Sequence, residues 1–172
     1  ELYDPIKDAS GDIGIFGHGY TYSGHPVACE VALKTLEIYE RDKIFEHVAS
    51  ISDYFQARVK KLNSFESVGE ARGVGLICGI ELVSDKATKA GFAPMGSAGR
   101  VVAKTCQDEG LIVRAIGDVI AMCPPLIITT NQIDEMFDMF ELALKKAESK
   151  ILWYLYLFVI HHSLINISYL YE

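Results

Sequence analysis

Residues 67–83 read SVGEARGVGLICGIELV, and this stretch decides the fold that we expect. In its second half Leu76, Cys78, Ile80 and Leu82 recur at every second position. A period of two is typical of a β-strand with one buried face. The opposite face then carries Ile77, Gly79, Glu81 and Val83. We therefore predict a strand over 67–83.

Four glycines, Gly69, Gly73, Gly75 and Gly79, interrupt this predicted strand. A glycine inside a strand indicates a bend or a close approach of another backbone, and either a ligand or a tightly packed neighbour would explain it. We favour the packing interpretation, because glycines in strands mark bulges as readily as binding sites.

The segment before this strand is amphipathic with a helical period. Its apolar residues recur every three or four positions, which places them in one stripe along a helix face. The opposite side is polar, and we expect His47 there to lie at the surface rather than to act as a ligand. The helix spans 43–62 and would lie across a sheet, with the stripe Ile44, Val48, Ile51, Phe55, Val59 and Leu62.

After the strand we expect a polar loop at 85–96 and a helix at 98–106 that Gly110 closes. Residues 111–128 read as two or three short strands, with a hairpin turn at Gly117 and Asp118 and a last strand at 126–128.

A final helix begins near Thr129 or Thr130, either of which would cap it. This order of elements predicts a two-layer α/β fold, in which long helices pack on a small, largely antiparallel sheet.

Arg114 is the one charge in the apolar run LIVRAI. It shares a strand face with Ile112 and Ile116, so its guanidinium either extends along a sheet edge or points into a cleft. A guanidinium can bind a carboxylate through two parallel hydrogen bonds. The residue pattern alone favours the sheet edge.

The stretch Phe16–Pro26, FGHGYTYSGHP, interleaves glycines with hydroxyl side chains and precedes a helix predicted from Pro26 to about Glu40. Such a turn at a helix N-terminus suits an anion, because free N–H groups and the helix dipole both favour negative charge. A capped turn without a ligand, with Ser23 or Gly24 near the cap, is the alternative. Residues 1–15 read as a loop.

Composition excludes several classes of function. The 172-residue chain is 50% hydrophobic and 23% charged, which is ordinary for a folded protein. A net charge of -7 without a basic stripe argues against nucleic acid and against anionic membrane as partners. The four cysteines are widely separated, so we expect no metal site and interpret them as buried thiols in a reducing compartment.

Residues 151–172 depart from the rest of the chain, since 151–160 read ILWYLYLFVI. This run is too short to span a bilayer, which needs about twenty apolar residues. We expect an extra packed element or a sequence foreign to the fold, with a membrane anchor as the less favoured alternative.

The segments GHGYTYSGHPVACEVALKTLE (17–37), ARGVGLICGIELV (71–83) and EGLIVRAIGDVIAMCPPLIITTNQIDE (109–135) resemble the C-terminal part of class III aminotransferases. The resemblance covers roughly 14–149 and implies a fold type I enzyme that uses pyridoxal 5'-phosphate. It implies that Tyr20 and Thr21 contact the cofactor phosphate of the adjacent subunit in a homodimer. It also assigns Arg114 to the substrate carboxylate.

The resemblance further implies four regions: the end of the large cofactor domain (1–25), linking helices (26–62), the C-terminal small domain (63–150) and a tail outside the family (151–172). The family's cofactor-binding lysine would lie before residue 1. We interpret Lys34 as an exposed helix residue instead, because a Schiff-base lysine must be desolvated. No catalytic residue is therefore assigned within the chain.

Two hypotheses about function follow. The chain is a fragment of a cytoplasmic aminotransferase that moves an amino group from an amine or ω-amino acid to a keto acid such as pyruvate, and is inactive alone. Alternatively, it is a non-enzymatic α/β binding or oligomerisation module derived from such a gene.

Overall fold

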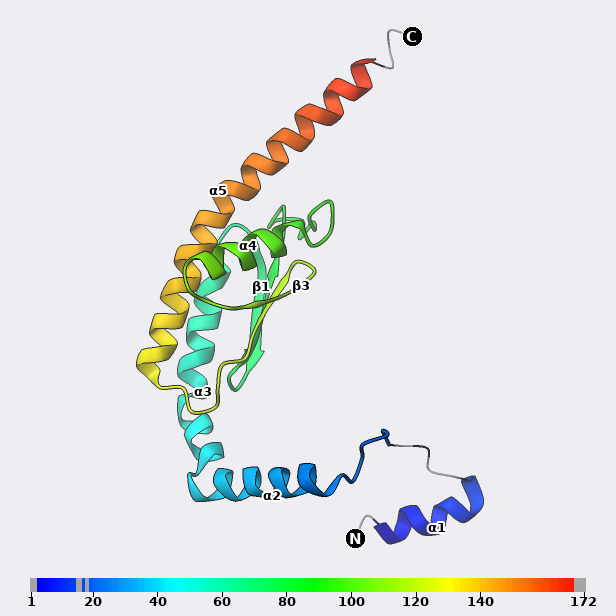
Figure 1. The fold of residues 1–172 in the computed structure, drawn as a ribbon. Helices are drawn as coiled ribbons and strands as arrows, with labels where there is room; N and C mark the ends of the chain where they lie inside the picture. Colours follow the sequence, from blue (N-terminus) through cyan, green and yellow to red (C-terminus); the bar gives the residue numbers. More distant parts are fainter. Residues whose placement is uncertain (1–2, 15–16, 18, 169–172) are drawn as a thin grey trace. The chain divides into compact units, whose positions relative to one another are not determined.

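The computed structural model describes residues 3–14, 17 and 19–168, with side chains described as far as Ile151. The chain divides into two compact units, an N-terminal unit of residues 1–42 and a C-terminal unit of residues 43–172. Figure 1 shows the helices and strands of each unit.

Helix α1 (Tyr3–Ile13) occupies the region that we predicted as a loop, so that prediction was wrong. Pro5 falls in the first turn of α1, where a missing N–H costs no helical hydrogen bond. Gly14 follows the helix with a φ of 89°, and its N–H donates to the Ser10 carbonyl at 3.2 Å. Proline and glycine thus mark the two ends of a helix here and do not form a loop.

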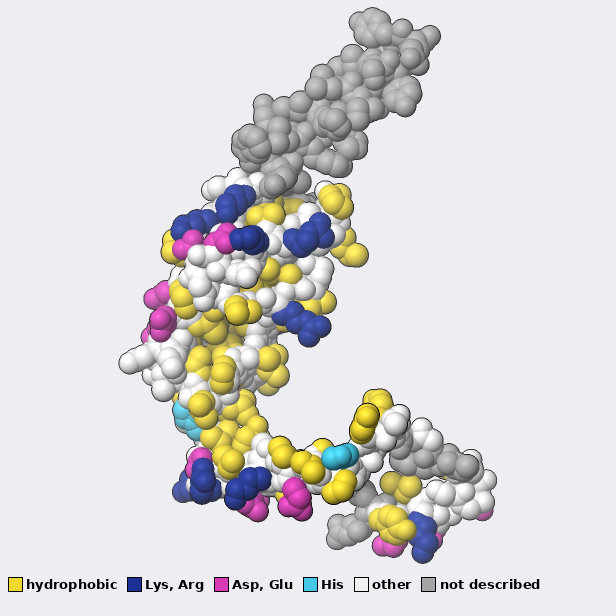
Figure 2. All heavy atoms as spheres, in the orientation of Figure 1, with side chains coloured by type: hydrophobic (Ala, Val, Ile, Leu, Met, Phe, Trp, Pro, Cys, Tyr) yellow, Lys and Arg dark blue, Asp and Glu magenta, His cyan; other side chains and the backbone are white. Residues whose placement is uncertain are grey.

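Helix α2 (Pro26–Arg41) confirms the predicted helix and begins with proline in its first turn. The predicted cap was wrong, because His25 is the N-cap residue and its side chain makes no capping hydrogen bond. No residue of α2 is buried within the described structure. Figure 2 shows apolar side chains gathered along this helix. Its exposed large apolar residues are Val27, Val31, Leu33, Leu36 and Ile38.

The C-terminal unit is built on a four-stranded sheet in the order β1-β2-β4-β3, in which every neighbouring pair is antiparallel. The strands are β1 (Val68–Val74), β2 (Ile77–Leu82), β3 (Arg114–Ile116) and β4 (Val119–Met122). The predicted α/β class with a small antiparallel sheet is therefore confirmed.

The single strand that we predicted over 67–83 is a hairpin. Gly75 has a φ of 58°, and the chain reverses between Val74 and Ile77, which pair with each other. A left-handed conformation suits glycine because it lacks a Cβ. The alternation seen in the sequence belongs to β2 alone.

Close packing explains two of the strand glycines, as we expected. A Cβ at Gly69 would lie 2.5 Å from Val83 Cγ1. A Cβ at Gly73 would lie 2.2 Å from the Ile77 carbonyl oxygen. Both distances are far below van der Waals contact, so a side chain at Gly69 would displace the Val83 side chain and one at Gly73 would push the backbones of the hairpin apart.

Helices α3 (Ile44–Lys61), α4 (Ser97–Asp108) and α5 (Thr130–Ser168) cover one face of the sheet (Figure 1). A short 3-10 turn (Leu62–Ser64) connects α3 to β1. The core lies between these layers, since burial of apolar surface favours this arrangement. Its fully buried large side chains include Phe55, Val59, Leu62, Ile80, Val102, Ile120, Phe137, Phe140 and Leu144.

Two predictions before α5 were wrong. Leu126 and Ile127 form a turn rather than a strand, and the Ile128 N–H donates to the Pro125 carbonyl at 3.0 Å. His47 is half-buried, and its Nε2 lies 2.9 Å from the Ile128 carbonyl oxygen. The histidine thereby ties α3 to the segment that precedes α5.

Thr129 caps α5, as one of the two alternatives predicted. Its hydroxyl accepts from the Gln132 N–H at 3.3 Å, and its own N–H donates to Gln132 Oε1 at 3.0 Å. This reciprocal pair is a capping box. Helix α5 then continues unbroken into the apolar tail as far as Ser168.

Within the part of the chain that the structure describes, no helix contains a stretch long and apolar enough to cross a membrane. Whether the tail packs on the fold depends on side chains beyond Ile151, which lie outside the described ones.

The cysteines divide into two classes. Cys78 and Cys106 are buried, as predicted, whereas Cys29 and Cys123 are exposed, so burial was wrongly predicted for those two. All four are free thiols.

Candidate functional site

The glycine-rich stretch closes into a tight turn between Tyr20 and Ser23. The Tyr20 N–H donates to Ser23 Oγ at 2.8 Å, and the Ser23 N–H donates to the Tyr20 carbonyl at 2.9 Å. Gly24 follows with a φ of 76°, and the chain then enters α2. Ser23 thus stabilises the turn instead of capping the helix. Phe16 and His18 of the same stretch lie outside the described residues.

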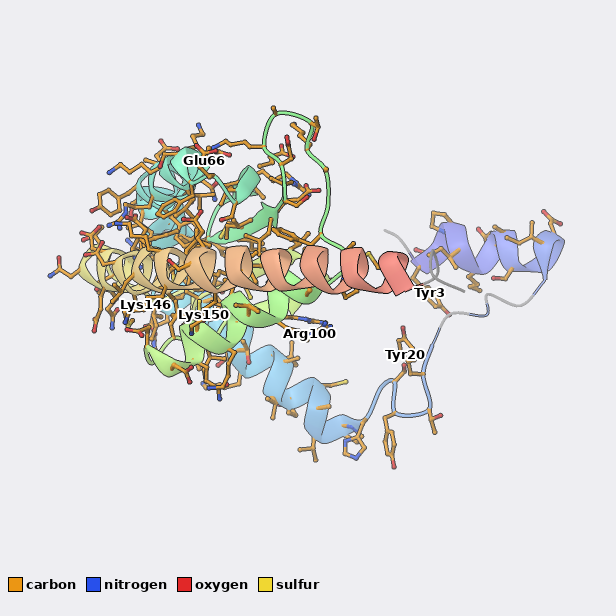
Figure 3. The ribbon with its side chains drawn as sticks, turned by 90° about the horizontal axis from the view of Figure 1, so that it is seen from above. Tyr3, Tyr20, Glu66, Arg100, Lys146 and Lys150 are labelled. Carbon is orange, nitrogen blue, oxygen red and sulfur yellow. The ribbon has the colours of Figure 1, made fainter. Side chains whose placement is uncertain are left out.

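The turn presents Thr21 at its tip. Thr21 is exposed, and neither its hydroxyl nor its N–H takes part in a hydrogen bond among the described residues. The Tyr20 N–H, in contrast, is already used by Ser23. The Tyr20 side chain is 85% exposed and stands away from the ribbon in Figure 3. The two donors of Thr21 are therefore available to an anion, next to the N-terminus of a helix.

The sheet face opposite the helices carries a cross-strand row of four residues. Arg72 pairs with Gly79, Gly79 pairs with Ala121, and Ala121 pairs with Arg114. Because Gly79 and Ala121 are small, the sheet surface between the two arginines carries no bulky side chain in this row. Because neighbouring strands lie about 4.8 Å apart, the Cα atoms of the two arginines stand roughly 14 Å apart.

The two arginines differ in their partners. Arg72 Nη1 donates to Glu70 Oε2 at 3.0 Å and to Glu81 Oε2 at 3.1 Å. Arg114 forms neither an ion pair nor a hydrogen bond through its side chain within the described residues, and it is exposed. The positive charge of Arg72 is therefore neutralised on the sheet, whereas that of Arg114 is open to an anionic ligand.

Strand β3 is an edge strand, so the edge position that the residue pattern favoured for Arg114 is confirmed. The predicted face is confirmed too, because Ile112 and Ile116 are exposed like Arg114, whereas Ala115 between them is half-buried. Edge position and ligand binding are compatible here, since the uncovered face of the sheet continues beside the arginine.

Two hollows of the C-terminal unit lie away from Arg114. One of about 530 Å³ lies between α4, α5 and the loop before α4, and another of about 520 Å³ lies beside it. Arg100 and Lys150, labelled in Figure 3, line the first. Neither hollow includes Arg114. The described residues hold no cluster of side chains that could bind a metal ion.

The family model for class III aminotransferases matches residues 6–144, which is most of the chain. The chain belongs to the class III aminotransferases. The family to which the sequence showed a resemblance is therefore confirmed. Class III aminotransferases depend on pyridoxal 5'-phosphate.

Curated relatives and solved structures agree with this assignment. The chain is 42% identical over 151 residues to a γ-aminobutyrate transaminase 1, mitochondrial, of Oryza sativa subsp. indica, covering 88% of the chain and 29% of the relative. A solved "Transaminase with L-ala" matches with a TM-score of 0.76 and 43% identity over 87% of the chain and 35% of that protein. An ω-aminotransferase from Paracoccus denitrificans matches with the same TM-score, 39% identity, and 87% and 33% coverage.

The matched region thus has the fold of a transaminase, and the chain spans about a third of the length of these relatives. Within this class III segment, the sequence singled out Arg114 as a candidate but did not predict the row at whose end it stands. The row depends on the pairing of β1 with β2. Gly73 and Gly75 in the sequence could have suggested the turn between these two strands.

Proposed function

We propose that this chain is part of a pyridoxal-phosphate-dependent aminotransferase that moves an amino group from an amine or ω-amino acid to a keto acid such as pyruvate. When bound, the cofactor supplies a carbonyl that takes up the amino group and a ring that stabilises negative charge during the transfer. Family membership supports amino-group transfer. The choice of substrates is supported by a relative named γ-aminobutyrate transaminase and by a solved structure named "Transaminase with L-ala".

Thr21 is proposed to bind the cofactor phosphate through its hydroxyl and N–H. The residues fit such a group, because both donors are without a partner among the described residues and belong to the turn that leads into α2. The Tyr20 N–H donates to Ser23 Oγ in this conformation and the Tyr20 carbonyl accepts from the Ser23 N–H, so the part of Tyr20 in the proposed contact is limited to its exposed side-chain hydroxyl.

The cofactor is proposed to belong to the adjacent subunit of a homodimer. The exposed apolar residues of α2 support this, because a large uncovered apolar surface favours contact with another part of the protein or with a second subunit. A dimer that dissociates reversibly without loss of cofactor affinity would contradict this part of the proposal.

Arg114 is proposed to bind the substrate carboxylate, and the observation that carries this role is its guanidinium, which is unpaired among the described residues and lies in one row with Gly79 and Ala121. The small side chains leave room above the sheet for a ligand. A bidentate, charge-assisted pair would orient the carboxylate and fix which end of the substrate reaches the cofactor.

The test compares Arg114→Ala with Arg72→Ala in the full-length enzyme that contains this segment. Loss of a charge-assisted pair worth about 3 kcal/mol should lower turnover with pyruvate or alanine by about a hundredfold. The half-reaction with an amine that lacks a carboxylate should change little. Arg72→Ala, which removes a charge already paired to Glu70 and Glu81, should leave both half-reactions near wild type.

If Arg114→Ala lowers both half-reactions equally, Arg114 supports the fold and does not bind the carboxylate. The chain alone, which spans about a third of its relatives, is expected to make no alanine from pyruvate and an amine donor. Alanine formed above a cofactor-only control would contradict that expectation. Binding without activity in the full-length protein would instead favour a non-enzymatic module.

A cytoplasmic location stays a prediction. The γ-aminobutyrate transaminase of Oryza sativa is named mitochondrial and one of Solanum lycopersicum is named chloroplastic, so these names do not support it.

A further inference from the structure

Asp118 joins the β3–β4 hairpin to the start of helix α4. Its Oδ2 accepts from the Gly96 N–H at 2.6 Å, and its Oδ1 accepts from the Gly99 N–H at 2.9 Å. Its carbonyl oxygen accepts from the Leu82 N–H at 2.9 Å. One residue of a two-residue turn is therefore bonded to both a helix and a neighbouring strand.

Asp118 acts as the cap that α4 lacks in its own sequence. The N-cap residue of α4 is Gly96, which has no side chain to offer. The first N–H groups of a helix need acceptors, and a carboxylate there also complements the helix dipole. Asp118 supplies both of its oxygens from a position some twenty residues further along the chain.

The contact is too close to tolerate a side chain between the two elements. A Cβ at Gly99 would lie 2.0 Å from the Gly117 carbonyl oxygen and 3.3 Å from Asp118 Cα. The turn therefore rests directly on the first turn of α4, where the carboxylate can reach both N–H groups.

Strand β3, which carries Arg114, is short. Strand β3 has three residues and pairs with β4 alone, through Arg114 with Ala121, Ala115 with Ile120 and Ile116 with Val119. So few pairs hold a register weakly, and the geometry of the turn then sets it. A slip of one residue would move the side chain of residue 114 to the helix-covered face.

We propose that Asp118 is a positioning residue: by anchoring the β3–β4 turn to α4, it fixes the register that presents Arg114 on the uncovered face of the sheet. This role deepens the proposed function and rests on it, since its catalytic consequence requires that Arg114 bind the substrate carboxylate. Asp118 itself touches no substrate.

The kinetic test uses the full-length enzyme with Asp118→Ala, Asp118→Asn and the control Asp108→Asn. Asp108 is exposed at the other end of α4, where it pairs with Lys104. Asp118→Ala should lower turnover with a keto acid or amino acid by about tenfold or more, which corresponds to about 1.4 kcal/mol. Turnover with an amine that lacks a carboxylate should stay within about twofold of wild type.

Asp118→Asn keeps one acceptor oxygen and should fall between wild type and Asp118→Ala. Asp108→Asn removes the same charge without touching the turn and should match wild type. If Arg114→Ala shows the substrate split but Asp118→Ala lowers both half-reactions equally, or neither, the positioning role is wrong.

A second measurement does not depend on catalysis. In the 172-residue chain, hydrogen exchange of the β3 and β4 amides should be about tenfold faster in Asp118→Ala, because local opening becomes easier. Exchange in β1 should not change, and Asp108→Asn should exchange like wild type throughout. Unchanged exchange in β3 would overturn the proposal. If Arg114→Ala shows no substrate split while β3 exchange still rises, the proposed function fails and the anchoring role of Asp118 stands.

Discussion

Arg58 of α3 donates a hydrogen bond to Asp134 of α5 across 2.5 Å, and this pair is the centre of the polar contact between the two helices. Arg58 also bonds Asp138 at 2.6 Å and Glu141 at 3.2 Å, and the Tyr54 hydroxyl donates to Asp134 at 2.7 Å. The Arg58 side chain is only 11% exposed. One guanidinium thus donates hydrogen bonds to three carboxylates on successive turns of α5.

The Arg58–Asp134 contact should make stability fall in acid. The Tyr54 hydroxyl, and then the Arg58 guanidinium, hold the pKa of Asp134 below its ordinary value of 3.8. A lowered pKa in the folded state contributes stability above the unfolded value, and this contribution is lost as pH falls through the folded value. Asp134→Asn should therefore be less stable than wild type at neutral pH, and the difference should shrink as pH falls below the ordinary carboxyl value of 3.8.

Urea unfolding at a series of pH values measures this difference. Asp53→Asn serves as the control, because Asp53 is an exposed carboxylate of α3 without a hydrogen bond among the described residues. A constant gap between wild type and Asp134→Asn over the whole pH range would show that the carboxylate charge is not what stabilises the contact.

Thr21 should control cofactor affinity in the full-length enzyme. Thr21→Ala removes a hydroxyl that no other described group uses, and loss of a hydrogen bond to a charged phosphate should weaken cofactor binding by about 1–3 kcal/mol. Thr21→Ser keeps the hydroxyl and should bind nearly as well as wild type. Spectroscopic titration with pyridoxal phosphate measures the dissociation constant, and equal values for the two variants would argue against phosphate binding by the hydroxyl.

Ser23 should act on the same site indirectly. Its hydroxyl accepts from the Tyr20 N–H, so Ser23→Ala leaves that turn with one hydrogen bond instead of two. The loss of a neutral hydrogen bond is worth about 1 kcal/mol, so the effect on cofactor affinity should be smaller than that of Thr21→Ala. A larger effect from Ser23→Ala in the same titration would identify Ser23 as the direct phosphate ligand.

Helices α3, α4 and α5 could be predicted from the sequence because each buries one face, which imposes a regular apolar period. Helix α2 shows the same period although none of its described residues is buried. The hairpin at 68–82 could not, because β1 has a register shift between Val68 and Glu70. Its two inward residues, Val68 and Ala71, are then three positions apart, and no period of two appears. Glycine and proline in residues 1–15 are compatible with either a loop or the two ends of a helix, and here they mark the ends of α1.

The candidate site was predictable in part for a similar reason. Arg114 stands out as a lone charge in an apolar run, and alternation gives its face. Arg114 has no ion pair among the described residues, which could not be read from the sequence because the neighbours of a strand residue depend on register. The β1–β2 pairing, for example, brings Glu81 to Arg72. The contact of Asp118 with Gly99 joins two elements that no local pattern relates.

Gly99 and Gly79 should respond oppositely to alanine. Alanine favours a helix over glycine by about 1 kcal/mol, yet at Gly99 the new Cβ would meet the Gly117 carbonyl oxygen at 2.0 Å. Backbone atoms cannot move aside cheaply, so Gly99→Ala should destabilise the chain by about 1–3 kcal/mol. At Gly79 the nearest atom would be Val119 Cγ1 at 3.6 Å, so Gly79→Ala should be neutral or slightly stabilising. Urea unfolding of both variants decides, and a stable Gly99→Ala would contradict the close packing.

The four thiols should alkylate in two classes. Burial raises the pKa of the Cys78 thiol to about 12 and that of the Cys106 thiol to about 11. Only a thiolate is a good nucleophile, and reagent access is blocked as well, so these two should resist iodoacetamide in the folded chain. Cys29 and Cys123 are exposed and should react. Mass spectrometry should therefore find two modifications in native buffer and four in urea. Rapid modification of Cys78 without denaturant would show that β2 opens in the folded chain, which its central place in the sheet argues against.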